Sequence, residues 1–158
     1  MAKRRVMFIA STGGHLHELL QLESMFENYE YSLITEKTKS NLYLKDKYKN
    51  RVHFLIYGTK HHIVTYPFKL LLNCFISLFY YLRYRPDYII TTGVHTAGPM
   101  CCLGKIFGSK IIYIETFANM VTKTVTGRFL YPISDKFIDQ WESMKKLYPD
   151  ADFWGWIF

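Results

Sequence analysis

Two glycine-rich turns contain most of the residues that could do chemistry in this chain. The first is Ser11-Thr12-Gly13-Gly14-His15, and the second runs from Thr91 to Pro99. Each turn follows a short apolar run and opens into a helical pattern. Glycine lets backbone N–H groups approach a ligand closely, and the start of a helix attracts negative charge. The turns therefore predict a phosphate or pyrophosphate site, formed by Ser11, Thr12, Gly13, Gly14, Gly93, His95 and Gly98.

His15 is placed for proton transfer beside that anion. It stands where the first helix begins, and the positive end of the helix favours a neutral imidazole. A neutral ring can take a proton from an acceptor hydroxyl, or it can donate a hydrogen bond to the pyrophosphate. His95 could bind the same ligand. The alternatives are that His15 only packs or caps its turn and that His95 is a solvated loop residue.

A carboxylate is expected at the same place. Glu115 follows the apolar run 110–114, which puts it at the same edge of a parallel sheet as the two turns. Glu115 could orient a sugar hydroxyl or act as the base in place of His15. It could equally cap the next segment or pair with a basic residue.

Several familiar catalytic motifs are missing. The first turn lacks the glycines of GxGxxG, although Glu36 stands where a ribose-binding acid would. The chain has no Walker lysine, GxSxG, HExxH or paired-carboxylate motif, so hydride transfer, NTP hydrolysis and ester hydrolysis lack their residues. The three cysteines have no metal-ligand spacing. We expect neither a metal nor a cofactor.

The elements around these turns alternate between strand and helix. Strands are predicted at 4–10, 30–35, 52–57, 87–92, 110–114 and 136–139. Helical patterns separate them at 16–26, 39–47, 67–83, 97–107 and 126–130. This alternation predicts an α/β fold, a Rossmann-like parallel sheet with helices on both faces. In the common strand order 3-2-1-4-5, strands one and four are neighbours, so both glycine turns converge at the carboxyl edge.

Positive charge is concentrated in the first half of the chain, whose 158 residues carry a formal net charge of +7. The first 85 residues hold 13 Lys and Arg against 6 Asp and Glu, whereas residues 86–158 hold 7 against 7. A basic surface suits an anionic membrane, and a solvated face without a partner is the alternative. No nucleic-acid recognition motif accompanies the charge, so no nucleic-acid partner is expected. The apolar run 6–10 is too short for a signal peptide.

The stretch 63–82 carries a single charge, Lys69, in twenty residues. Pro67 fits a first helical turn, which places the helix at 67–83. It could be a crossover helix buried on one face, a helix lying on a membrane surface, or a bilayer span. The first two are compatible on opposite faces. The membrane contact would be made by Tyr66, Lys69, Phe75, Phe79, Arg83 and Arg85.

The C-terminal segment 150–158 has four aromatic residues in its last six positions. Such a tail left in solvent would favour aggregation, so we expect it to dock on its own domain or on another chain. The docking residues would be Trp154, Trp156, Ile157 and Phe158.

These motifs, in this order, resemble the acceptor-side subunits of two-part glycosyltransferases. The resemblance covers essentially the whole chain and rests on 11–15, 91–93, 98–99, 114–117, 126–132, 135–141 and 155–158. In eukaryotes this family provides the membrane-anchoring half of the UDP-GlcNAc transferase that adds the second sugar in asparagine-linked glycan assembly. In bacteria it provides the enhancer subunit of capsule and exopolysaccharide glycosyltransferases. The first turn is also similar to the Gly-Gly-His turn of the GlcNAc transferase that forms lipid II.

The resemblance implies that residues 1–158 form the N-terminal half of a GT-B fold, which binds a polyprenyl-pyrophosphate-linked sugar. A separate UDP-sugar-binding subunit would supply the other half, and this chain alone would be inactive. His15 becomes the candidate base with Glu115 close by, and the location is the cytoplasmic face of the membrane. Eukaryotic members begin with a membrane anchor that we do not expect here, so the contact would be made by a surface such as 66–85 or by the partner subunit. A non-catalytic scaffold and a stand-alone nucleotide-binding enzyme stay open as alternatives.

Overall fold

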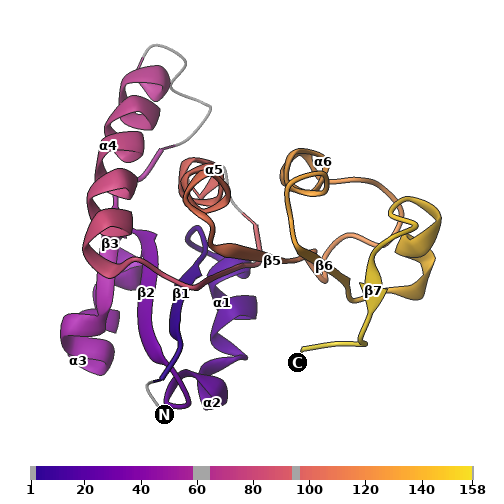
Figure 1. Cartoon of the computed structure of the whole chain (residues 1–158), viewed down its shortest axis with the longest axis horizontal. Coiled ribbons are helices and arrows are strands. Elements are labelled where there is room, and N and C mark those ends of the chain that lie inside the picture. Colours follow the sequence, from indigo (N-terminus) through magenta and orange to yellow (C-terminus); the bar gives the residue numbers. More distant parts are fainter. Residues whose placement is uncertain (1–2, 59–64, 94–96, 158) are drawn as a thin grey trace.

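The computed structural model describes residues 3–58, 65–93 and 97–157 (Figure 1). Within these residues, seven parallel strands form one sheet in the order β3-β2-β1-β4-β5-β6-β7. The strands are β1 (Arg5–Ile9), β2 (Glu30–Glu36), β3 (Val52–Leu55), β4 (Tyr88–Thr91), β5 (Lys110–Ile114), β6 (Lys136–Asp139) and β7 (Asp152–Phe153). The predicted fold class and the predicted order of the first five strands are confirmed.

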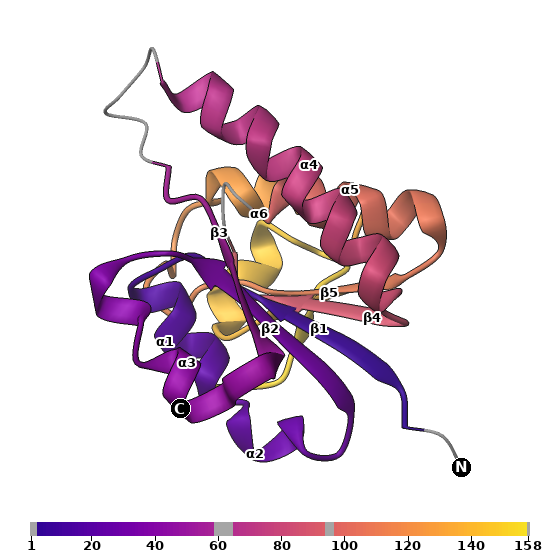
Figure 2. The same ribbon diagram turned by 90° about the vertical axis from the view of Figure 1, so that its left-hand side faces the viewer.

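Helices cover both faces of the sheet (Figures 1 and 2). One face carries α1 (Gly14–Leu20), α2 (Glu23–Phe26) and α3 (Leu44–Tyr48), and the other carries α4 (Tyr66–Tyr84), α5 (Gly98–Phe107) and α6 (Val125–Leu130). Short 3-10 turns lie at Lys39–Asn41, Lys49–Arg51 and Glu142–Lys146. Because successive strand residues face opposite sides, β1 sends Val6 and Phe8 into one core and Met7 and Ile9 into the other. This two-sided burial explains the uninterrupted apolar runs in the sequence.

Two local predictions differ from the structure, and one strand was not predicted. The helical pattern at 16–26 is divided into α1 and α2, because the backbone tightens where the N–H of Gln21 bonds the carbonyl of Glu18. The pattern at 39–47 is a 3-10 turn followed by the shorter α3. The strand β7 was not predicted, since two residues are too few for a periodic signal.

The predicted crossover helix is present as α4, which connects β3 to β4. Among the described residues, no helix has both the length and the apolar character needed to cross a membrane.

Candidate functional site

The two glycine turns meet at the carboxyl edge of the sheet. β1 and β4 are paired neighbours, as the predicted strand order requires, so the segments that follow them start side by side. Two hydrogen bonds then join the turns. The ring Nδ1 of His15 lies 2.9 Å from the backbone carbonyl oxygen of Thr92, and the Thr92 hydroxyl donates to the carbonyl of His15 at 2.7 Å. His15, the last residue of the first turn, is therefore held against the second turn.

Two glycines in these turns adopt backbone conformations that other residues rarely take. Gly13 has a φ of +83° and Gly93 a φ of +114°. A Cβ added at Gly93 would lie 3.4 Å from the ring of His15 and 3.4 Å from the hydroxyl of Tyr113. By contrast, a Cβ added at Gly13 or Gly14 would meet no atom within 4 Å. Glycine thus allows the second turn to approach His15, while the space over the first turn is open.

The contact with Thr92 fixes which ring nitrogen of His15 can act. A carbonyl oxygen only accepts hydrogen bonds, so Nδ1 carries the proton in this contact. In the neutral ring, the lone pair is then on Nε2. The His15 side chain is 38% exposed, which leaves it accessible to a ligand. The arrangement suits a general base that takes a proton at Nε2 and is oriented through Nδ1.

Glu115 is buried rather than open to a ligand, with 1% exposure. Its carboxylate accepts hydrogen bonds from the hydroxyls of Tyr113 (3.1 Å), Thr124 (3.0 Å) and Tyr148 (3.2 Å), and from the backbone N–H of Thr116 (3.0 Å). With its oxygens engaged in this way, Glu115 is placed to organise the loops around it. The structure thus favours the capping alternative over that of a base.

The cluster around Glu115 also fixes the start of α6. Thr124 is the N-cap residue, and its hydroxyl oxygen accepts a hydrogen bond from the backbone N–H of Gly127 at 2.9 Å. A Cβ added at Gly127 would lie 2.2 Å from Glu115 Oε2 and 2.4 Å from the hydroxyl of Tyr148. Glycine is therefore required at position 127 for the buried carboxylate to keep its partners.

The remaining residues of the predicted anion site have varied environments. The Ser11 hydroxyl lies 3.4 Å from the Thr12 carbonyl. The Thr12 backbone N–H donates a hydrogen bond to the buried side chain of Glu36, with 3.3 Å between the nitrogen and Oε2, so this amide is already engaged within the chain. Gly98 is the first residue of α5, and a Cβ added to it would lie 3.6 Å from the Phe129 ring. His95 and Phe158, which the sequence also proposed as binding residues, lie outside the described part of the chain.

Two buried carboxylates have no predicted role from the sequence. Glu18 on α1 is 4% exposed, and Asp139 at the end of β6 is fully buried. A signal for Glu18 was available, because residues three apart share one face of a helix and His15-x-x-Glu18 has that spacing. Asp139 only closes a short strand pattern, and its burial depends on segments that pack over it.

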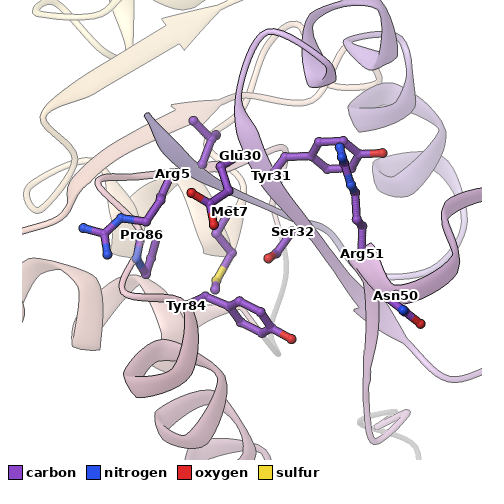
Figure 3. A pocket seen from close by; sticks show the side chains of 10 residues that line it. Arg5, Met7, Glu30, Tyr31, Ser32, Asn50, Arg51, Tyr84 and Pro86 are labelled. Atoms are coloured by element: carbon purple, nitrogen blue, oxygen red, sulfur yellow. The ribbon is translucent and has the colours of Figure 1, made fainter. Parts of the chain in front are cut away.

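The pocket in Figure 3 lies at the amino ends of the strands, opposite to the edge that carries the glycine turns. It has a volume of about 220 Å³ and is lined by the first residues of β1 and β2 and by residues that precede β3 and β4. Both of its arginines are paired within the chain: Arg5 lies 3.1 Å from Asp87, and Arg51 lies 3.5 Å from Glu27. Because its cations are satisfied and it is far along the strands from the glycine turns, we do not place the anion site there.

The helix α4 has polar side chains on its buried face. Asn73, Ser77 and Tyr81 are buried at four-residue intervals. The Asn73 amide bonds both the backbone N–H and the carbonyl of Ile56, at 2.8 and 2.9 Å, and the Tyr81 hydroxyl lies 2.8 Å from that of Ser109. Specific hydrogen bonds therefore fix this face of α4 to the domain.

The opposite face of α4 is apolar and exposed. Its side chains with half or more of their surface exposed are Phe68, Leu71, Leu72, Phe75, Phe79 and Leu82. Arg83 and Arg85 are exposed at the end of the helix, and Tyr66 and Lys69 are half-buried at its start. Figure 2 shows α4 lying along the outside of the sheet, beside α5. We call the six apolar side chains the α4 stripe.

The C-terminal segment folds back on the chain and still exposes aromatic surface. β7 pairs with β6, and the ring of Trp156 lies 5.4 Å from that of Phe117 and 5.1 Å from that of Trp141. Ile157 packs against the core on the α1 side of the sheet. Trp154 and Trp156 nevertheless remain 67% and 59% exposed. The tail is thus docked on its own chain, and two large rings face outward.

The sequence matches the family described as "Oligosaccharide biosynthesis protein Alg14 like" over residues 6–157. The "UDP-N-acetylglucosamine transferase subunit ALG14" of Mus musculus is 26% identical over 179 residues, covering 97% of this chain and 82% of the mouse protein. The Homo sapiens protein of the same name is 28% identical, covering 96% of this chain and 82% of the human one.

Two solved structures share the fold at lower identity. MurG from Acinetobacter baumannii has a TM-score of 0.75 at 20% identity, covering 95% of this chain and 44% of the enzyme. UDP-N-acetylglucosamine 2-epimerase from Rickettsia bellii has a TM-score of 0.74 at 15% identity, covering 98% of this chain and 45% of the epimerase. This chain spans less than half of either enzyme, and its fold matches the N-terminal half of their GT-B architecture. On the family match across residues 6–157, the chain belongs to the Alg14-like family of oligosaccharide biosynthesis proteins.

Proposed function

We propose that this chain is the acceptor-binding half of a two-part, UDP-sugar-dependent glycosyltransferase that acts at the cytoplasmic face of the membrane. Its substrate would be a polyprenyl-pyrophosphate-linked saccharide, in capsule or exopolysaccharide assembly. The relatives named as transferase subunits support a role in a heteromer, and a fold like the N-terminal half of the GT-B architecture fits the acceptor side of such an enzyme. The observation that carries the proposal is the position of His15 between two glycine turns at the carboxyl edge of the sheet.

In this proposal, the pyrophosphate lies over Gly13 and Gly14, where the space is open. Nε2 of His15 takes the proton of the acceptor hydroxyl as that oxygen attacks the anomeric carbon of the sugar. The bond from this carbon to the UDP oxygen breaks, UDP leaves, and the configuration is inverted. The partner subunit holds the UDP-sugar, so the reacting groups come together only when both chains are docked.

The experiment that tests this function is a transfer assay on membranes with a panel of UDP-sugars. We expect transfer to the lipid-linked acceptor when this chain and its partner subunit are both present, and almost none with either chain alone. Full activity from this chain alone would overturn the half-enzyme proposal. Full activity from the partner alone would favour the scaffold alternative, in which this chain only recruits a complete enzyme.

The exposed rings at the C-terminus are our proposed docking site for the partner subunit. A solvent-exposed tryptophan that becomes buried on binding typically contributes strongly to affinity. In the same assay, Trp154→Ala should therefore require more partner subunit to reach half of the maximal rate. Met25→Ala, which shortens an exposed side chain on α2, is the matched control. An unchanged requirement for the partner would place the interface elsewhere.

The α4 stripe is our proposed membrane contact. Tyr66, Lys69, Arg83 and Arg85, which the sequence predicts for the same contact, would take part in it. The helix exposes apolar side chains while it buries polar ones, which is the reverse of what a helix facing only water requires. Basic side chains beside such a stripe are attracted to anionic headgroups, by about 1 kcal/mol each near the surface. The outer face of α4 thus fits a lipid surface.

Glutamates at two positions of the stripe should weaken this contact. Burying one phenylalanine contributes about 1.5–3 kcal/mol, so we expect Phe75→Glu with Phe79→Glu to weaken vesicle binding by more than about tenfold. Co-sedimentation with vesicles of phosphatidylcholine and phosphatidylglycerol would measure this. Met25→Glu, on the opposite face of the sheet, is the control. Equal binding by the double variant and the control would exclude α4 as the contact.

A further inference from the structure

Glu18 connects the first glycine turn to a distant loop. It lies on α1, three residues after His15, and its side chain is buried. Its Oε1 atom accepts hydrogen bonds from the Thr116 hydroxyl at 3.0 Å and from the backbone N–H of Phe117 at 2.6 Å. Both donors belong to the loop that follows β5. The carboxylate is therefore held by hydrogen bonds from this loop and not by its own helix.

The second oxygen of Glu18 is directed toward His15. Oε2 is buried and has no hydrogen-bond partner among the described residues. It lies 3.8 Å from Nδ1 of His15, which is too long for a hydrogen bond but short enough for a strong interaction between opposite charges. Nδ1 of His15 thus faces both the Thr92 carbonyl and this carboxylate oxygen.

The surroundings of Glu18 act on its charge in opposite directions. Burial raises the pKa of Glu18, whereas the hydrogen bonds from Phe117 and Thr116 and the nearby His15 lower it in part. Among the described residues, the other titratable group that acts on Glu18 is Glu115, at the end of β5, which raises the pKa further. A positive charge on His15 would relieve the unfavourable burial of the Glu18 carboxylate.

We propose that Glu18 is the positioning residue of His15, an inference that rests on the proposed function. When Nε2 takes the proton of the acceptor hydroxyl, the ring becomes an imidazolium, and the buried carboxylate 3.8 Å from Nδ1 stabilises its positive charge. The proton moves from the acceptor oxygen to Nε2, and the departing UDP carries the electron pair of the broken bond. Glu18 itself exchanges no proton in this step. Its contribution is the fixed negative charge, held in place by Thr116 and Phe117.

The test is Glu18→Gln in the complex of this chain with its partner subunit. Glutamine keeps an oxygen that can accept from Thr116 and Phe117 but removes the negative charge. We expect the maximal transfer rate to fall by about 10- to 100-fold. Without the carboxylate the imidazolium is less stable, so the acidic limb of the pH–rate profile should move about one pH unit lower. Glu27→Gln, which removes an exposed carboxylate, should change neither quantity.

A second variant separates the charge from the structure. Thr116→Val removes one of the donors that hold Glu18 and keeps the carboxylate, so it should lower the rate without moving the acidic limb. If Glu18→Gln behaves like Thr116→Val, with a lower rate and an unmoved limb, Glu18 only supports the loop and the inference is wrong.

A double-mutant cycle distinguishes failure of the inference from failure of the proposed function. If Glu18 acts through His15, Glu18→Gln should have almost no further effect in a His15→Ala background. If the fold-reductions in rate from the two single variants multiply in the double variant, the two residues act independently. That result overturns the inference and leaves His15 as the base. A His15→Ala complex with full activity would instead overturn the base itself, and the role of Glu18 with it.

Discussion

Replacing His15 with alanine is expected to lower the rate of sugar transfer by the complex by about 10²- to 10⁴-fold, the usual contribution of a positioned general base. The geometry gives the reason. Nδ1 is held by the Thr92 carbonyl, so Nε2 is the nitrogen that can take a proton, and Gly93 approaches the ring because it has no side chain. Alanine removes the base and leaves the open space over Gly13 and Gly14 unchanged.

The measurement is steady-state transfer with saturating UDP-sugar and lipid-linked acceptor. We expect the loss in kcat, because the proton is transferred in the transition state, whereas a histidine that only bound the pyrophosphate would mainly raise KM. His17→Ala is the matched control, since His17 is an exposed histidine on the same helix. A His15→Ala complex as fast as the control would leave this chain without a catalytic role and favour the scaffold alternative.

The second large effect is expected on stability, from Asp139→Asn. Asp139 is fully buried, and neither of its carboxylate oxygens has a hydrogen-bond partner among the described residues. Burial, and then the nearby Glu115, raise the pKa of Asp139 to about 7, and Lys145 lowers it in part. The folded chain therefore retains a proton on Asp139 under conditions in which the unfolded chain has lost it.

The direction of the pH dependence follows from this difference. Between about pH 4 and pH 7 the folded state binds more protons at Asp139 than the unfolded state does, so the contribution of this residue to stability falls as the pH rises and is constant above pH 7. Asparagine cannot ionise. Asp139→Asn should therefore be more stable than the wild type at pH 8, by on the order of 2–4 kcal/mol, and nearly equal to it at pH 4.

Urea unfolding at pH 4, 6 and 8 would measure the difference in the free energy of unfolding. Asp46→Asn, which removes an exposed carboxylate on α3, should stay within about 0.5 kcal/mol of the wild type at each pH. A stability difference between Asp139→Asn and the wild type that does not change with pH would show that Asp139 is ionised in the folded state throughout this range.

The sequence by itself determined the arrangement of the sheet and the meeting of the two turns. Apolar runs separated by helical patterns specify a parallel sheet, and the position of a turn after a strand specifies the edge where it lies. His15 could be identified in this way because its turn, its strand and its helix are adjacent in the chain. These signals are local, and each is repeated over several residues.

Only the tertiary structure decided the environments of the carboxylates. From the sequence alone, Glu115 could be an accessible base. In the structure it is buried, and one of its hydrogen-bond partners is the hydroxyl of Tyr148, 33 residues away. Glu18 meets Thr116 across 98 residues, and Asp139 is fully buried on β6, a strand that pairs with β5 on one side and β7 on the other. Such contacts form between loops that have no periodic pattern. Periodic burial can be read along one segment, whereas the partner of a single buried charge is fixed by how distant segments pack together.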